Sequence, residues 1–399
     1  MQSSKIKNNF NIKEVIFLII ITCIVSLIMG YNLNNNSSKN SNEKKNDIME
    51  EIYTNYKYIK DNYYEEVDDS TLLKGAIEGM VNSLGDNYST AIDEESSNSF
   101  NARLTGSYSG LGVEISNDTS NNIVVTEVFD DSPAKKAGIE VLDIIKKINN
   151  QSFENKKTSE LTNYVKNSED SNFTITVLRN NEELTFELVR EIVNIKSVYS
   201  ELKTVDNHKI GYIYISIFAS NTAKQFKESI EKLESENIES LIIDVRYNTG
   251  GHLTAVVDML SCLLDSTKII YQIENKGEIT KYYSKGDITK EYPIVVLQNG
   301  ESASASELLS SALKEQYGAT IIGEKSFGKG TVQKLITLDN GIQYKFTTKK
   351  WLTSNGEWIN EKGVDVDIEV ELNNEYFENP SDEMDNQLQE AINYLITNH

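Results

Sequence analysis

The spacing of apolar residues changes character along the chain. Residues 47 to 95 carry apolar side chains at helical intervals, which predicts two helices. From about residue 106 to residue 190, short runs alternate apolar and polar side chains as strands do. The clearest predicted strands are Ile123–Val128 and Phe173–Leu178. The pattern therefore predicts a helical region followed by a small β-rich domain with one or two helices.

Residues 210 to 323 alternate predicted strands with predicted helices. We expect strands at 210–217, 241–245 and 294–298, and helices beginning at Asn221, after Gly251 and at Ser304. This rhythm is typical of an α/β domain, in which crossover helices cover the sheet and loops at strand ends carry the chemistry. A further helix is expected over residues 382 to 397.

An apolar run near the N-terminus belongs to neither domain. Val15–Met29 follows three lysines, as the apolar core of an export signal does, and no A-x-A cleavage site comes after it. The run is short for a bilayer span of about 20 residues but adequate for an uncleaved anchor. A buried core helix is the alternative, which the polar linker 32–46 disfavours because it offers nothing to pack against. We expect a single-pass cell-membrane protein whose domains after this run lie outside the cytoplasm.

Composition excludes several classes of function. The net charge of -22 leaves no basic face for phosphate binding, so nucleic acid is not an expected partner. Cys23 and Cys262 are the only cysteines, and Cys23 lies in the apolar run, so a disulfide framework is excluded. The three histidines are His208, His252 and His399, and no HExxH or CxxC pattern occurs. No metal or cofactor is expected.

The first chemical candidate is Asn299–Leu309, which follows a predicted strand and opens a predicted helix. A serine at such a turn lies at the positive end of the helix dipole. Backbone N–H groups beside it can receive a developing oxyanion. Alternatively, these serines only cap the helix, with Ser304 and Glu307 forming a capping box. The segment alone leaves both interpretations open.

The second candidate is the glycine-rich stretch Gly323–Gln333. It nearly spells a P-loop, but Gly330 stands where a magnesium-binding Ser or Thr would, and the following residues alternate like the first strand of a hairpin. Lys329 is a candidate base if burial lowers its pKa from about 10.4. Gln333 would lie on the same strand face and orient the amine. The alternative for Lys329 is a solvated surface lysine.

The third candidate is Leu241–His252, an apolar strand that runs into a glycine pair and then a helix. Glycines let backbone amides approach a ligand closely, and a helix start adds positive potential. The backbone N–H groups of Gly250 and Ala305 are the expected oxyanion donors. The alternative is a tight connection without a chemical role.

These three segments, in this order, resemble the signature of the carboxyl-terminal processing peptidases, which are tail-specific serine proteases with a PDZ domain. The matching strings are DVRYNTGG, ESASASELL and GEKSFGKGTVQ. The separation of 25 residues between Ser304 and Lys329 also resembles the family's. The resemblance implies that the nucleophile is Ser304 rather than Ser302 or Ser306, that the base is Lys329, and that Gln333 supplies the orienting amide.

The resemblance extends over nearly all of the chain beyond the apolar run. The further matching stretches are Leu84–Thr90 before the PDZ domain, Gly110–Val113 and Asp131–Ile139 within it, and Asp385–Ile392 in the terminal helix. A PDZ loop turns successive N–H groups toward a chain-terminal carboxylate, so Gly110, Leu111, Gly112 and Val113 are the expected peptide-binding residues. One departure is Leu142-Asp143, where the family commonly has Gly-Asp, and it puts the tightness of that turn in doubt.

The resemblance implies an α/β protease core of the crotonase/Clp-protease-like type with an inserted PDZ domain, N-terminal helices and the membrane anchor. The expected parts are a cytoplasmic tail and anchor at 1–31, a linker at 32–46, helices at 47–98, a PDZ domain at 99–190, the serine protease core at 191–370 and a C-terminal helical segment at 371–399.

The function implied is a serine endopeptidase that cleaves proteins near their C-terminal tails, with the PDZ domain recognising the tail or gating the site. Protein substrates with exposed tails and the membrane are the expected partners, and a homodimer stays open. The main alternative is a PDZ scaffold that binds tails without cutting them. A serine, a lysine and a glutamine at the family's spacings speak against that alternative.

Overall fold

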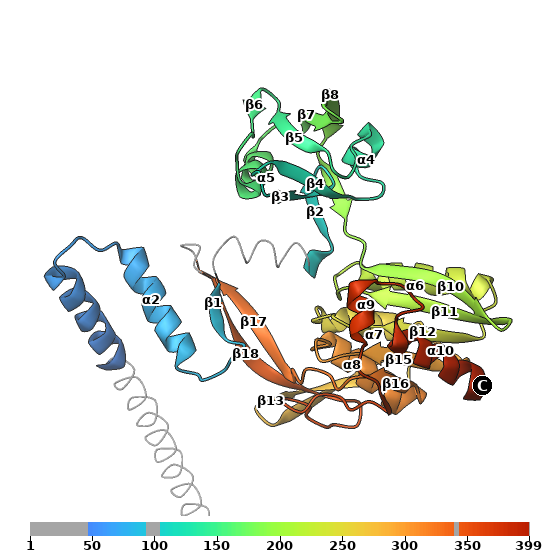
Figure 1. The fold of residues 1–399 in the computed structure, drawn as a ribbon. Helices are drawn as coiled ribbons and strands as arrows, with labels where there is room; N and C mark the ends of the chain where they lie inside the picture. Colours follow the sequence, from blue (N-terminus) through green and yellow to red (C-terminus); the bar gives the residue numbers. More distant parts are fainter. Residues whose placement is uncertain (1–46, 93–103, 339–342, 399) are drawn as a thin grey trace, which may run out of the picture. The chain divides into compact units, whose positions relative to one another are not determined.

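The computed structural model describes residues 47–92, 104–338 and 343–398 (Figure 1). The chain divides after Met80 into two units. The first contains a helix over residues 47–62 and most of α2 (Asp69–Asn82), as the periodicity predicts. Within it, Asp69 accepts a hydrogen bond of 2.7 Å from Tyr56 Oη and pairs with Lys60.

The predicted anchor Val15–Met29 lies outside the described residues. In the part of the chain that the structure describes, none of the helices combines the length and the apolar character that a bilayer crossing requires.

A six-stranded antiparallel sheet forms the β-rich domain. Its order is β3-β4-β5-β7-β8, with β6 beside β5, and the strands are β3 (Val113–Asn117), β4 (Ile123–Val128), β5 (Ile144–Ile148), β6 (Gln151–Ser152), β7 (Asn172–Arg179) and β8 (Glu182–Val189). Two helices pack with it, α4 (Pro133–Ala137) and α5 (Thr158–Asn167). The pair β2 (Ser107–Gly110) and β9 (Glu191–Asn194) joins both ends of the domain. The predicted strand at 123–128 is confirmed to the residue, and that at 173–178 is one residue longer at each end.

The turn after Ile139 forms although the sequence lacks the glycine that the family commonly has there. Leu142 adopts φ +74°, the left-handed conformation that glycine adopts freely, with its side chain in solvent. Such a conformation costs an ordinary residue roughly 1–2 kcal/mol. The next residue, Asp143, is buried, bonds Arg179 Nε at 2.6 Å and accepts the Glu140 N–H at 3.0 Å. The buried aspartate therefore holds the turn although the glycine is missing.

A second six-stranded sheet forms the α/β core. Its order is β10-β11-β12-β15-β16-β19, with β10 antiparallel to β11 and the rest parallel. The strands are β10 (Val198–Val205), β11 (His208–Ile215), β12 (Ser240–Asp244), β15 (Ile294–Gln298), β16 (Thr320–Gly323) and β19 (Ile368–Glu369). The α/β prediction is confirmed, because strands covered on both faces appear in sequence as continuous apolar runs.

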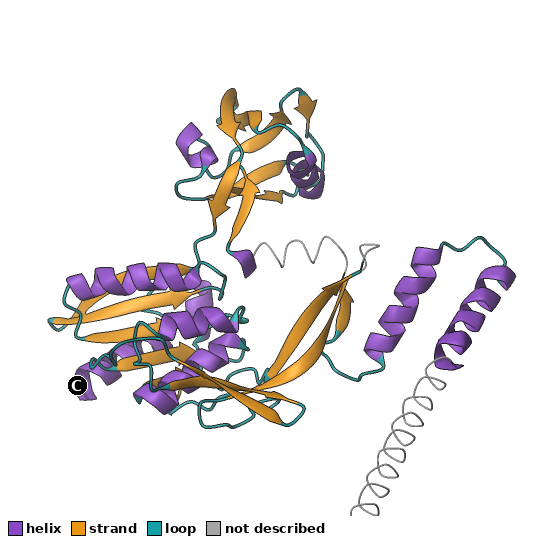
Figure 2. Cartoon of the chain, turned by 180° about the vertical axis from the view of Figure 1, so that it is seen from behind, coloured by secondary structure: helices purple, strands orange, loops and turns teal. Residues whose placement is uncertain are grey.

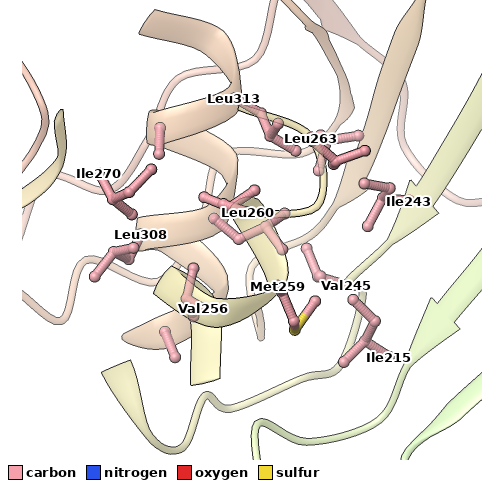
Figure 3. Close-up of a cluster of buried hydrophobic side chains, with 14 of the residues drawn as sticks. Ile215, Ile243, Val245, Val256, Met259, Leu260, Leu263, Ile270, Leu308 and Leu313 are labelled. Carbon is pink, nitrogen blue, oxygen red and sulfur yellow. The ribbon is translucent and has the colours of Figure 1, made fainter. Parts of the chain in front are cut away.

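Helices cover both faces of this sheet (Figures 1 and 2). One face packs against α6 (Thr222–Ser235), α7 (Leu253–Leu260) and α8 (Ala305–Ala312), which runs on into a π-helical turn at Leu313–Tyr317. The other packs against α10 (Asn386–Asn398), which α9 (Asn374–Glu378) precedes. Figure 3 shows Ile243 of β12 among Leu260, Leu263 and Leu313. The residue beside it, Ile242, packs on the α10 side.

A five-stranded sheet completes the core. It comprises β1 (Thr90–Ile92), β13 (Ile269–Asn275), β14 (Glu278–Tyr283), β17 (Thr331–Thr337) and β18 (Gln343–Leu352), with β18 pairing β1, β13 and β17. The predicted hairpin after Gly330 corresponds to the antiparallel pair β17 and β18, and its tip at 339–342 lies outside the described residues.

A buried ionic cluster ties the end of β12 to the start of α10. The Arg246 guanidinium, 5% exposed, bonds Asp244 at 2.6 Å and Asp385 at 2.7 Å. It also bonds Gln387 Oε1 at 3.0 Å. Asp385 also accepts the Leu388 N–H at 3.0 Å and so caps the start of α10. Its removal deletes both the charged bonds to Arg246 and this cap, although Asp244 still pairs with the guanidinium.

We therefore expect Asp385→Ala to lower the free energy of unfolding by roughly 3 kcal/mol. Chemical denaturation at neutral pH measures it. Glu228→Ala, which removes an exposed partner of Lys224 on α6, is the control and should leave the unfolding midpoint unchanged. A loss below about 1 kcal/mol for Asp385→Ala would mean that Asp244 alone compensates Arg246.

Candidate active site

The three serines at the start of α8 have different surroundings. Ser302 Oγ donates to the Val245 carbonyl at 2.8 Å, and Ser306 Oγ donates to the Asn248 carbonyl at 2.7 Å. Both side chains are fully buried and fasten this turn to the loop after β12. Ser304 lies between them, lines a cavity of about 440 Å³ and makes no side-chain cap bond. Of the three, Ser304 alone presents its hydroxyl to the cavity.

Ser304 has a strained backbone. Its φ of 55° and ψ of -110° are rare for a residue with a Cβ. Such conformations cost about 1–3 kcal/mol and persist where the surroundings determine them. Two constraints are visible: the Ser304 N–H donates to Glu307 Oε2 at 2.7 Å, and the Ala303 N–H donates to the Asn248 carbonyl at 3.1 Å. These two bonds therefore hold Ser304 in its strained conformation at the start of α8.

The cavity collects side chains from segments far apart in the chain. Ser304, Lys329, Gln333 and Gly250 all line it. Thr331, Gln333 and Leu335 of β17 do so as well, which agrees with the expectation that Lys329 and Gln333 share a face. Val332, next to a register shift in the strand, also lines the cavity. Its apolar walls come from Leu104, Ile217, Leu253, Val332 and Leu335. No cluster of His, Cys, Asp or Glu suited to a metal occurs among the described residues.

Lys329 is largely removed from water at this site. Burial lowers the pKa of its amine, and the positive charge of Lys345 lowers it further. The amine lies 5.1 Å from the ring centroid of Tyr88, where a cation–π contact favours the charged form. Within the described residues it forms no hydrogen bond with Ser304 Oγ. The lysine is thus desolvated but turned toward the tyrosine.

Gln333 is also engaged elsewhere. Its Nε2 donates to Thr331 Oγ1 at 2.9 Å and to Thr347 Oγ1 at 3.2 Å. In this conformation the amide is held by two threonines, and the expected bond to the Lys329 amine is not formed.

The expected oxyanion donors differ in availability. The Ala305 N–H has no acceptor within the described part of the chain, whereas the Gly250 N–H donates to Asn248 Oδ1 at 2.9 Å. A Cβ on Gly250, whose φ is +105°, would lie 2.7 Å from the Ala303 carbonyl and 3.0 Å from the Ala305 nitrogen. Glycine at 250 therefore keeps the Ala305 amide accessible. Gly251 also lines the cavity.

The predicted peptide-binding loop, Gly110–Val113, is joined to the start of α4. The Ala134 N–H donates to the Leu111 carbonyl at 2.9 Å, and Ser132 Oγ donates to the Gly112 carbonyl at 3.2 Å. Gly112 has φ +88°, and a Cβ there would collide with Ser132. The loop shape consequently requires glycine at this position. Its role in peptide binding stays a prediction.

Three residues of the site were not predicted from the sequence to contribute to it. Tyr88 and Lys345 approach Lys329, and Glu307, considered as a cap, bonds to the loop that carries Lys329. Tyr88 falls in the stretch Leu84–Thr90, which resembled the family, but no local pattern links it to the lysine.

Comparisons with known proteins agree with these features. Residues 209–370 match "Peptidase family S41", residues 109–189 match "PDZ domain", and residues 28–96 match "Activating protease CtpB N-terminal domain". The chain is 36% identical over 325 residues to the carboxy-terminal processing protease CtpB of Bacillus subtilis (strain 168), covering 81% of this chain and 68% of that protein.

Two further relatives extend this similarity. The carboxy-terminal processing protease CtpA of the same organism is 36% identical over 321 residues, covering 79% of this chain and 68% of that protein. The crystal structure of a putative S41 protease from Bacteroides fragilis NCTC 9343 superposes with a TM-score of 0.51 at 14% identity, covering 81% of this chain and 90% of that one. At that identity the superposition shows a shared fold alone.

We expect Lys329→Met to raise the free energy of unfolding at neutral pH. The folded-state pKa of this lysine lies below its ordinary 10.5, so the folded protein pays a penalty for the charged amine at neutral pH. That penalty shrinks as the pH rises through the folded-state pKa and vanishes above 10.5. Denaturant unfolding of both proteins from pH 7 to 10 should show the advantage of methionine declining.

Lys325→Met is the matched control, because Lys325 is exposed in the same loop and pairs with Asp365 at 2.8 Å. It should give no comparable gain. A Lys329→Met protein less stable than the wild type at pH 7 would contradict the desolvation argument.

Proposed function

Because this chain belongs to peptidase family S41, as a carboxy-terminal processing serine protease with a PDZ domain, we propose that Ser304 is its nucleophile and Lys329 its general base. One observation carries the proposal: Ser304, the only one of three neighbouring serines to reach the cavity, shares that cavity with a lysine whose pKa is lowered by burial. A serine and a neutral amine are the two groups that acyl transfer without histidine requires.

The reaction proceeds in two stages. The neutral Lys329 amine takes the proton of Ser304 Oγ as the oxygen attacks a peptide carbonyl, and the tetrahedral oxyanion is received by the Ala305 N–H and a glycine N–H. The protonated lysine gives its proton to the leaving amine, so that an acyl-enzyme and a free amine remain. The lysine then deprotonates a water molecule that hydrolyses the ester and restores Ser304 Oγ–H.

We infer that the described conformation is a resting one. Lys329 points to Tyr88, Gln333 bonds two threonines, and the Gly250 N–H is taken by Asn248. A change of side-chain rotamer at Lys329 brings its amine toward Ser304, and a release of Gln333 supplies the orienting amide. Binding of a substrate tail to the PDZ domain is the proposed trigger.

The PDZ domain is proposed to capture the C-terminal tail of a protein substrate. Strand β3 pairs only with β4 within the described sheet, so its other edge offers N–H and C=O groups to an added strand. The N–H groups of Gly110–Val113 would then receive the terminal carboxylate.

Three finer assignments belong to the same proposal. The core is of the crotonase/Clp-protease-like type, which its parallel strands and covering helices support. Val15–Met29 anchors the chain in the cell membrane, which its apolar composition supports. The catalytic domain is proposed to lie outside the cytoplasm, because the lysines before the run follow the pattern of an export signal. Membrane fractionation of the full chain tests the anchor. A homodimer stays open to measurement of mass in solution.

Ser304→Ala and Lys329→Ala should each lower the rate of casein cleavage by roughly 10³-fold or more, because nucleophile and base act as a unit. Circular dichroism should show both variants folded. Lys325→Ala, in the same loop, should cleave at the wild-type rate. A Lys329→Ala protein that stays active while His252→Ala is inactive would move the role of base to the histidine of the cavity. A wild type without cleavage, with or without a tail peptide, would favour the tail-binding scaffold.

Gly112→Ala should weaken binding of a peptide with an apolar C-terminus by at least roughly tenfold, since the added methyl group strains a positive φ and displaces Ser132. Fluorescence polarisation measures the affinity, and the amidated peptide tests whether a carboxylate is recognised. Gly277→Ala is the matched control, because Gly277 has φ +91° with open space around it. Equal loss of affinity in both variants would contradict recognition by the Gly110–Val113 loop.

A further inference from the structure

A buried carboxylate joins the serine turn, residues 302–306, to the lysine loop, residues 324–330 between β16 and β17. Glu307 is fully buried and accepts four hydrogen bonds. Its Oε2 accepts from the Ser304 N–H at 2.7 Å and the Lys329 N–H at 2.9 Å. Its Oε1 accepts from the Gly328 N–H at 2.6 Å and Ser326 Oγ at 2.7 Å. One side chain thus holds the backbone amides of both catalytic residues.

This arrangement exceeds what a helix cap requires. A capping box uses one bond from the glutamate to the amide of the N-cap residue, and here that bond is the one to Ser304. The other three donors lie 19, 21 and 22 residues further along the chain. Most of the carboxylate's bonding capacity is therefore directed at the lysine loop.

The lysine loop is also held by hydrogen bonds to segment 361–364. Ser326 Oγ accepts the Val364 N–H at 2.6 Å, and the Glu361 N–H donates to the Gly328 carbonyl at 2.8 Å. A Cβ on Gly328 would lie 3.0 Å from the Gly363 and Lys362 nitrogens. Segment 361–364 thus presses the loop onto Glu307, and the loop cannot withdraw without breaking these contacts.

The four donors suit an ionised carboxylate. A neutral carboxyl group has to donate from one oxygen, and both oxygens here face backbone N–H groups. Burial raises the pKa of Glu307, while the bonds from Ser326, Lys329, Gly328 and Ser304 oppose that rise. No lysine or arginine in the described ranges forms an ion pair with it, so the backbone amides are what stabilise the charge.

We propose that Glu307 is a positioning residue. Its carboxylate binds the backbone amides of both Ser304 and Lys329, and it thereby sets the distance between the two backbones at which their side chains can come into contact. The inference rests on the proposed roles of Ser304 and Lys329. The same buried negative charge also raises the pKa of the Lys329 amine, against the effects of burial and Lys345. Glu307 therefore influences both the geometry and the protonation of the base.

Glu307→Gln is the decisive variant, since it keeps the shape of the side chain, removes the charge and turns one acceptor oxygen into a donor facing N–H groups. We expect kcat to fall on the order of 10- to 100-fold, because the reacting groups are displaced. KM should stay within about threefold of the wild-type value, because the residues that line the cavity are unchanged. The acid limb of the profile of kcat/KM against pH should move to lower pH, because loss of the negative charge lowers the pKa of Lys329.

Asp265→Asn is the matched control. Asp265 lies in the same core and accepts hydrogen bonds from Thr267 N at 2.8 Å and Thr289 Oγ1 at 2.6 Å. None of these three residues lines the cavity. It should lose stability without a change in kcat or in the pH profile of the folded protein. Ser326→Ala removes one donor and keeps the charge, so a fall in kcat of several-fold is expected if Glu307→Gln does not fold.

The possible outcomes distinguish the positioning role of Glu307 from the proposed roles of Ser304 and Lys329. Wild-type kcat and an unmoved acid limb in Glu307→Gln, or wild-type kcat in Ser326→Ala where Glu307→Gln is unfolded, would overturn the positioning role while Ser304→Ala and Lys329→Ala remain inactive. Activity in either of those two alanine variants would overturn the dyad itself.

Discussion

Desolvation of a single amine is the condition on which the site depends. A lysine in water keeps its proton at neutral pH, so it can act as a base only where burial penalises the charged form. The groups around Lys329 come from parts of the chain that are far apart in sequence, among them the loop after β12, the pair β17 and β18, and the residues before β1. The pairing of β18 with both β1 and β17 brings Tyr88 and Lys345 to the lysine.

The two halves of the site differ in how firmly they are held. The serine turn is fixed by Ser302, Ser306 and Glu307, and its strain shows that these contacts outweigh the intrinsic preference of the backbone. The lysine loop has a fixed backbone, but its side chain contacts Tyr88. Gln333 is likewise bonded to threonines that can release it. The proposed activation therefore requires rotation of side chains, which is faster and smaller than a shift of the backbone.

The sequence predicted the parts of the fold that local patterns determine. Strand β15 at Ile294–Gln298 was expected to the residue, because a strand covered on both faces is an uninterrupted apolar run between polar turns. Strands β14 and β19 were not expected: β14 is exposed along its length and β19 has two residues, so neither carries a period. Tyr88 and Lys345 reach Lys329 through long-range strand pairing, and neither that pairing nor the φ of Ser304 leaves a signal in local sequence.

The candidate site also shows why buried charge is kept where apolar packing would give more stability. Lys329 and Glu307 each cost free energy to bury, and neither forms an ion pair within the described residues. Glu307 is compensated by amides of the two proposed catalytic segments, so the same bonds stabilise its charge and place those segments. Lys329 is compensated only in part: the Tyr88 ring and the charge of Glu307 favour its charged form, but burial and Lys345 outweigh them and lower its pKa. The fold therefore satisfies the buried anion with hydrogen bonds but compensates the buried cation only in part, and this asymmetry is what the proposed serine–lysine mechanism needs.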